Sequence, residues 1–128
     1  MIELIGQPEP GNIRPFSRAS RAGGLVFVSG HSAPHDPARG IHRGDTPEDE
    51  VRNALIHIGE ILREAGSGFD KIVQVTMLIT DPADYAACNR EYVRHFPNGL
   101  PARHTARFGV PTDARVAFAC IPLANPRA

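Results

Sequence analysis

Residues 46–80 read "TPEDEVRNALIHIGEILREAGSGFDKIVQVTMLIT" and decide the fold. The first part predicts a helix, because Thr46 is a suitable N-cap and Pro47 suits the first helical position. Apolar residues then recur at steps of three and four: Val51, Ala54, Leu55, Ile58, Ile61, Leu62 and Ala65. This spacing forms one apolar stripe that packs against a core. Gly66 ends the helix at a C-cap position.

The second part of this stretch predicts a strand over residues 71–80. Apolar residues alternate with less apolar neighbours along it: Val73, Val75, Met77 and Ile79. A period of two places them on one face of a sheet. Residues 81–96 then predict a second helix, which Asp81 can cap. Four residues share one face of that helix: Tyr85, Asn89, Tyr92 and Phe96.

Strands are also predicted at both ends of the chain. Residues 15–34 read as a β-hairpin that turns at Gly23 and Gly24, since glycine tolerates positive φ. Residues 101–110 and 114–123 read as a final pair of strands joined by the turn "PTDA", which we predict to be a second hairpin.

The order of these elements predicts an α+β sandwich, with one mixed sheet and both helices on one face. The chain is predicted to be a single domain, residues 1–128. The strands are too apolar for their second face to meet water. We therefore expect an oligomer that covers it.

Composition excludes some classes of function. Lys plus Arg number 14 and Asp plus Glu number 14, so a net charge of +0 gives no general attraction to nucleic acid or to anionic membranes. No apolar run is long enough to span a membrane, and no signal peptide is expected, so we expect a cytoplasmic protein. Cys88 and Cys120 lack a metal-ligand spacing and are predicted to be buried, reduced thiols.

Arg103 is the first candidate site residue, in "GLPARHTARF" at residues 99–108. In a strand, Arg103 and Thr105 point to the same side, where they offer a fork for a carboxylate. A guanidinium stays charged near neutral pH and needs an anion where it is enclosed. The alternatives are a structural carboxylate, a ligand, or plain solvation.

Histidines and one asparagine are weaker candidates. The loop after the first hairpin holds five groups that could ligate zinc: His31, His35, Asp36, His42 and Asp45. Proline and glycine interrupt that loop, so we expect a surface loop without a metal. We predict that His57 lies at the edge of the helix stripe and that Asn89 hydrogen-bonds to backbone.

Four segments follow one another in a specific order and spacing: "SRASRAGGLVFVSG" (17–30), residues 50–81 of the helix–strand unit, "ADYAACNREYVRHF" (83–96) and "LPARHTARFGV" (100–110). Together they resemble the Rid family, the reactive intermediate deaminases that are also called YjgF. The segments "GGLVFVSG" and "PAR" are its most specific parts, and the resemblance covers nearly the whole chain.

The resemblance implies a chorismate-mutase-like subunit and a homotrimer with clefts between subunits. Members of the family hydrolyse imines and enamines, such as 2-aminoacrylate, to 2-oxo acids and ammonia, without a metal or an organic cofactor. By this resemblance Arg103 binds the substrate carboxylate, the Thr105 backbone N–H helps to bind it, and the backbone of Gly30 faces the ligand across the subunit boundary.

The chain also departs from the family pattern. The final strand commonly reads V-E-I-E-A-I-A, and here it reads "VAFACIP", so Ala117 and Ala119 replace two glutamates. The second of those glutamates positions the attacking water, which an alanine cannot do. Phe16 replaces a tyrosine, His31 follows "SG" where Gln or Met is common, and His57 replaces an asparagine.

Three hypotheses of function follow. The first is a Rid-type deaminase for a small carboxylate-bearing imine or enamine, in which Phe16 walls the cleft and His31 partly replaces the missing base. The second is a non-catalytic trimer that binds a 2-oxo acid or a similar small molecule. The third, RNA cleavage, is disfavoured because no basic stripe with interleaved aromatic residues exists.

Overall fold

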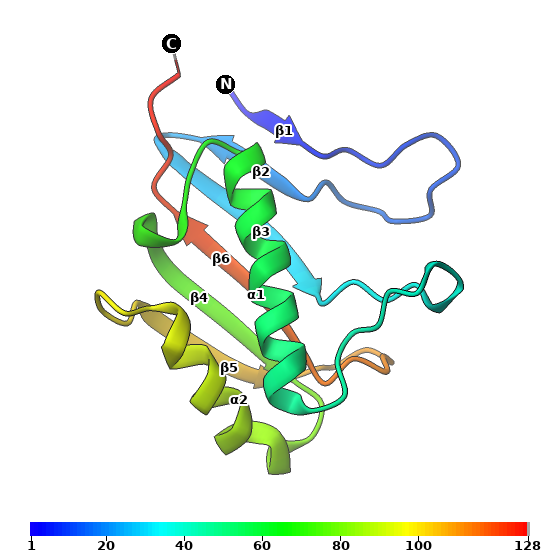
Figure 1. Cartoon of the computed structure of the whole chain (residues 1–128). Helices are drawn as coiled ribbons and strands as arrows, with labels where there is room; N and C mark the ends of the chain where they lie inside the picture. Colours follow the sequence, from blue (N-terminus) through cyan, green and yellow to red (C-terminus); the bar gives the residue numbers. More distant parts are fainter. Residues whose placement is uncertain (128) are drawn as a thin grey trace.

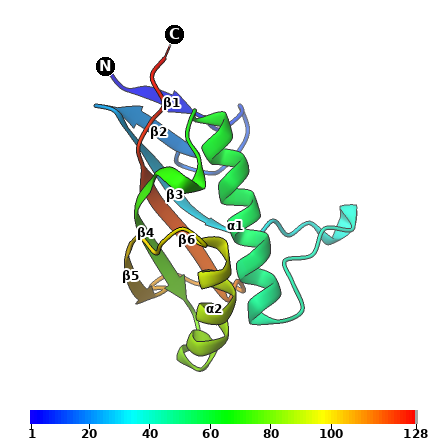
Figure 2. The ribbon, with the colours of Figure 1, turned by 60° about the vertical axis from the view of Figure 1, so that its left-hand side comes forward.

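Six strands form one mixed sheet in the order β1-β2-β3-β6-β4-β5, and two helices cover one of its faces (Figures 1 and 2). The computed structural model describes residues 1–127. The strands are β1 (Glu3–Ile5), β2 (Ala19–Ala22), β3 (Leu25–Ser32), β4 (Ile72–Ile79), β5 (Ala102–Arg107) and β6 (Val116–Pro122). The helices are α1 (Pro47–Glu64) and α2 (Tyr85–Tyr92). Short 3-10 turns are η1 (Pro37–Arg39), η2 (Phe69–Lys71), η3 (Pro82–Asp84) and η4 (Val93–His95).

Helix α1 begins and ends as predicted. The Thr46 hydroxyl accepts a hydrogen bond from the backbone N–H of Asp49 at 3.1 Å, which caps the first turn. At the other end Gly66 has a φ of +75°, and Ser67 N–H donates to the Leu62 carbonyl at 2.8 Å. This is a Schellman-type end, which turns the chain toward β4.

The predicted second helix is shorter than residues 81–96. It is divided into η3, α2 and η4, with Asp81 accepting a hydrogen bond from the backbone N–H of Ala83 at 2.9 Å. The strand β1, which pairs with β2, was not predicted from the sequence. The three-residue β1 is too short to show a period.

The predicted final hairpin is wrong. β5 pairs in parallel with β4, whereas β6 lies between β3 and β4 and is antiparallel to both. Burial explains the difference, since "VAFACIP" in β6 is largely buried and suits a central strand, while most of β5 is exposed at the sheet edge. Helix α2 carries the chain from β4 back to the start of its parallel neighbour β5 (Figure 1).

The core lies between the sheet and the two helices. Its strand residues include Val75 and Met77 of β4 and Phe118 of β6. Val73 was predicted to join them but is 50% exposed, because a register irregularity at Ile72 and Gln74 interrupts the alternation. Cys88 and Cys120 are buried and free, as predicted.

A buried carboxylate fixes the start of β6 against α1. Glu50 Oε2 accepts hydrogen bonds from the backbone N–H groups of Arg115 at 2.6 Å and Val116 at 3.3 Å. Its Oε1 accepts from Arg115 Nη1 at 3.0 Å. The first turn of α1 is thereby tied to the central strand.

The second face of the sheet carries no helix among residues 1–127 (Figure 2). Phe27 is 42% exposed there, on the opposite side of β3 from the buried Val26 and Val28. We refer to this side as the open face. Single exposed apolar residues are ordinary, but apolar strand positions on an uncovered sheet indicate a surface that binds something.

Candidate functional site

The strand pairing places Arg103 and Thr105 on the helix side of the sheet. They lie opposite Val75 and Met77 of the parallel strand β4, whose side chains are in the core beneath the helices. Residues in register share a face, so Arg103 extends from the edge strand toward α2. The sequence prediction that the two side chains point the same way agrees with this register.

Two tyrosines of α2 surround the guanidinium of Arg103. Its Nη2 donates a hydrogen bond to Tyr85 Oη at 3.3 Å. Its Cζ lies 4.7 Å from the ring centroid of Tyr92 and 5.8 Å from that of Tyr85. Both distances are within the range of a cation–π interaction. Within residues 1–127 no carboxylate forms an ion pair with Arg103. The alternative of a structural carboxylate partner therefore finds no support here.

The two tyrosines have opposite electrostatic environments. The pKa of Tyr85 is lowered, chiefly by a hydrogen bond with Asn89 and then by the charge of Arg103. The pKa of Tyr92 is raised, because its side chain is buried. The Tyr92 hydroxyl and Asn89 Oδ1 are buried without a hydrogen-bond partner in the part of the chain described. The expectation that Asn89 bonds to backbone is thus wrong for its oxygen.

This tyrosine–arginine cluster was only half visible in the sequence. The shared face of Tyr85, Asn89 and Tyr92 follows from helical spacing. That this face meets Arg103 depends on the parallel pairing of β5 with β4, which the predicted hairpin did not allow.

Gly30 and Phe16 lie in a different place, on the open face. They line a cavity of about 530 Å³ with Ser29, Ser32, Leu78, Phe108, Gly109, Val110, Thr112 and Ala117. The lining is mostly apolar, and Ala117 contributes from β6. Ala119 lies further along β6, in a neighbouring hollow that also contains Gln74 and Thr76.

His31 lies on the helix side, away from the open-face cavity. It is 9% exposed, and its Nε2 is 3.1 Å from the carbonyl oxygen of Arg18. Its ring centroid is 5.5 Å from that of His57 on α1, edge to face. A register irregularity in β3 between Val28 and His31 accompanies this placement. Burial lowers the pKa of both imidazoles.

The remaining histidines do not form a metal centre in the structure. The rings of His35 and His42 are 6.2 Å apart. Among residues 1–127 no group of three or more His, Cys, Asp or Glu side chains is placed to hold a metal ion. No helix in the same range is long and apolar enough to cross a membrane.

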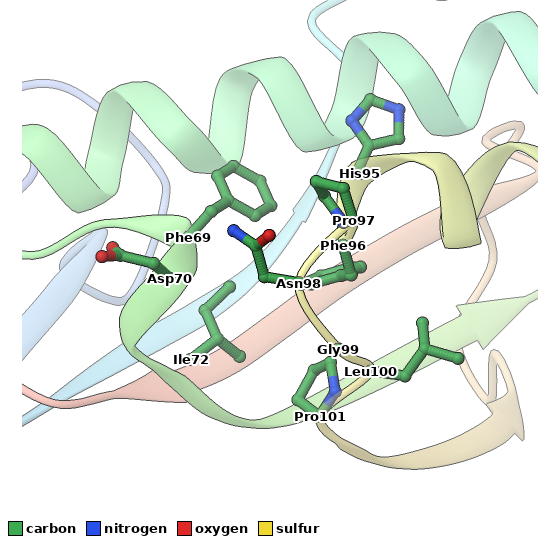
Figure 3. Close-up of a pocket in the computed structure, with 10 residues that line it drawn as sticks. All are labelled: Phe69, Asp70, Ile72, His95, Phe96, Pro97, Asn98, Gly99, Leu100 and Pro101. Carbon is green, nitrogen blue, oxygen red and sulfur yellow. The ribbon is translucent and has the colours of Figure 1, made fainter.

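A further cavity, of about 460 Å³, lies beside the loop that precedes β5 (Figure 3). Its walls include Phe69, Ile72 and Phe96. Its two ionisable lining residues are Asp70, whose carboxylate points away from Phe96 in Figure 3, and His95, which is engaged by Glu91 at 2.8 Å. None of the predicted site residues lines it, so we assign it no chemistry.

The chain matches known proteins over most of its length. A family profile described as Endoribonuclease L-PSP matches residues 6–118. The chain is 33% identical over 113 residues to Reactive Intermediate Deaminase A, chloroplastic, of Arabidopsis thaliana, covering 88% of this chain but only 60% of that protein. It is 33% identical over 118 residues to 2-iminobutanoate/2-iminopropanoate deaminase of Capra hircus, covering 91% of this chain and 85% of that one.

Solved structures agree with the fold. The crystal structure of E. coli TdcF with bound serine superposes with a TM-score of 0.78 at 27% identity, covering 96% of this chain and 100% of that one. The six-stranded sheet of this chain, the two helices on one face of it and the match of residues 6–118 lead to one conclusion: the chain belongs to the Endoribonuclease L-PSP family, the Rid or YjgF family that its motifs resemble.

Proposed function

We propose that the chain is a Rid-type deaminase that hydrolyses a small carboxylate-bearing imine or enamine, with Arg103 binding the carboxylate. The observation that carries the proposal is the guanidinium of Arg103, which lies on two tyrosine rings and has no carboxylate partner within residues 1–127. Its charge is free to bind a ligand, and a guanidinium fork suits a carboxylate. Two relatives at 33% identity are named as deaminases, one of them for 2-iminobutanoate and 2-iminopropanoate, which supports the same class of reaction.

The complete site needs more than one copy of the chain. Arg103 and Thr105 lie on the helix side of the edge strand, while Gly30 and Phe16 line a cavity on the open face. One subunit cannot present both groups to a small ligand. A homotrimer in which the Gly30 cavity of one subunit meets the Arg103 edge of the next would join them, and the apolar open face supports such a contact.

The cavity supports a substrate with a larger or less polar side chain than that of 2-aminoacrylate. Phe16, Leu78 and Ala117 present apolar atoms where a carboxylate or hydroxyl could have been. Burying a polar substituent against them would cost free energy, whereas an alkyl or aromatic group gains from burial. The reaction as proposed assigns no proton transfer to His31, because that imidazole is beneath α1 beside His57.

Trapping of unhydrolysed imine tests the proposal. An L-amino-acid oxidase generates 2-imino acids in the presence of semicarbazide, and we expect the native protein to lower the amount of trapped imine. We expect Arg103→Ala to lower this activity by at least about tenfold. A charge-assisted hydrogen-bonded contact typically contributes about 1.5–3 kcal/mol.

Arg107→Ala is the matched control, because it removes a guanidinium from the same strand. Arg107 belongs neither to the tyrosine–arginine cluster nor to the lining of the open-face cavity. It should keep the native rate. If the native protein and buffer alone gave the same amount of trapped imine, the proposed deaminase function would be overturned. If 2-oxobutanoate still raised the melting temperature in an Arg103-dependent way, the non-catalytic binding trimer would take its place.

A further inference from the structure

The hydroxyl of Tyr85 is an acid–base group with no assigned role, and it lies beside the proposed carboxylate site. Tyr85 is 44% exposed, and its Oη accepts the hydrogen bond from Arg103 Nη2 at 3.3 Å. A ligand held by that guanidinium is therefore adjacent to the hydroxyl. Because Oη is the acceptor in this bond, its own proton is left to be donated to a substrate or a water molecule.

Other groups near Arg103 cannot perform this proton transfer. The Tyr92 hydroxyl is buried, with 3% of that residue exposed, and burial raises its pKa. The pKa of the Cys88 thiol is raised to about 11 by burial. Asn89 has no proton to exchange near neutral pH. Tyr85 is left as the exposed, titratable group at the guanidinium.

The surroundings of Tyr85 also make proton exchange easier. Asn89, Arg103 and Thr105 all lower its pKa, with the hydrogen bond from Asn89 making the largest contribution. Two tyrosines beside one guanidinium thus have pKa values displaced in opposite directions. Of the two, Tyr85 is the exposed one and the one whose pKa is lowered, which singles it out for proton exchange.

We propose that the Tyr85 hydroxyl relays protons between the attacking water and the imine nitrogen. The proposal rests on the deaminase function above. The phenylalanine rings of the chain are not equivalent, because the relay requires an oxygen in contact with the group that holds the substrate. Ala119 supplies no such oxygen on β6.

The relay balances without any further reactant. As water attacks the C=N carbon, a water proton passes to Tyr85 Oη and the phenol proton passes to the imine nitrogen, whose π electron pair has become a lone pair. The product is a neutral carbinolamine. In the second step, Oη takes the proton of the new hydroxyl and returns its own to nitrogen. The C–N bond then breaks, the C=O bond forms, and ammonia leaves.

Kinetics of Tyr85→Phe test the relay. We expect kcat for 2-imino acid hydrolysis to fall by about 10²-fold, the typical contribution of general acid–base catalysis, with KM and melting temperature close to native. The native enzyme should show a solvent deuterium isotope effect on kcat, and the residual activity of Tyr85→Phe should not show it. If Tyr85 only positioned Arg103, KM would rise instead while kcat stayed native, and that result would overturn the relay.

Tyr92→Phe is the matched comparison, since it removes the other hydroxyl and keeps the ring beneath Arg103. Its kcat should fall much less than that of Tyr85→Phe. Equal losses in both variants would contradict a specific role for Tyr85. No turnover by the native protein would overturn the proposed function and the relay together, whereas turnover that Tyr85→Phe leaves intact would overturn the relay alone.

A spectroscopic test is independent of turnover. The chain holds 2 tyrosines and no tryptophan, so Tyr92→Phe leaves Tyr85 as its sole phenol, whose ionisation can be followed by ultraviolet absorption. We expect its pKa to lie below the ordinary value of about 10. Adding Arg103→Ala, or saturating with 2-oxobutanoate, should raise it, because each removes or neutralises a nearby positive charge. A titration that neither change alters would place Tyr85 outside the site.

Discussion

Arg103 shows how one side chain takes its role from its neighbours. Its guanidinium contacts tyrosine rings and a phenol oxygen, which stabilise a cation without neutralising it. A structural ion pair would have occupied the same fork. Because none of these contacts neutralises the charge, the guanidinium is able to form a charge-assisted interaction with the carboxylate that we propose as its ligand.

We expect His31 and His57 to make the free energy of unfolding depend on pH. Burial lowers the pKa of both side chains, so the folded protein binds fewer protons than the unfolded chain near the ordinary histidine pKa of about 6.5. Their contribution is fully present above that pH and is lost as the pH falls below it. We expect the free energy of unfolding, measured with urea, to decrease from about pH 7.5 to about pH 5.5.

Replacement of one imidazole isolates this effect. His57→Gln should reduce the decrease, since it removes one of the two groups that resist protonation and one of the charges that oppose protonation of His31. His35→Gln removes an exposed imidazole and should leave the decrease as in the native protein. If both variants lost the same stability across this range, the pair of His31 and His57 would not be the source of the pH dependence.

Helix α1 and strand β6 are joined by one buried carboxylate. Glu50 accepts hydrogen bonds from two backbone N–H groups at the start of β6 and from Arg115. Glu50→Ala would leave these donors without a partner in a buried place. We expect it to lower the free energy of unfolding by about 3 kcal/mol, measured by chemical denaturation.

Glu48→Ala provides the control on the same helical turn. Glu48 pairs at 3.2 Å with Arg90, which is largely exposed. Water and salt screen such a pair, so its loss should cost less than about 1 kcal/mol. A comparable cost for both variants would indicate that burial of Glu50 adds nothing.

Strand β5 shows what a pattern along one segment leaves open. The sequence predicted which of its side chains share a face, but it did not predict which strand β5 pairs with. An edge strand with few apolar residues matches several neighbours equally well. The more apolar β6 competes successfully for the centre of the sheet, where both of its neighbours are strands. Only that competition brings Arg103 beneath α2.

We expect copies of the chain to assemble through the open face of the sheet. Phe27→Glu places a charge on that face, where a second copy would bury it without a partner. We expect this variant to be a monomer. It should also lose imine hydrolysis, because the Gly30 cavity would no longer meet the Arg103 edge of a neighbour. Multi-angle light scattering measures the mass directly.

Ile56→Glu makes the same chemical change on the exposed side of α1. Assembly and activity should both be native in this variant. If Phe27→Glu assembled like the native chain, the open face would not be the interface. A monomer that kept full activity would place the whole site within one subunit.

The sequence by itself determined the helix–strand unit at residues 46–80, the fold class of a sheet covered by helices, and the family. It also determined that the side chains of Arg103 and Thr105 point to the same side of their strand. These depend on local periodicity, on caps and on motif spacing, which lie within a single segment. The tertiary structure alone decided the strand order, the burial of His31 under α1 and the contact of Tyr85 with Arg103. These depend on competition between segments distant in sequence for the same neighbours, and no single segment carries that information.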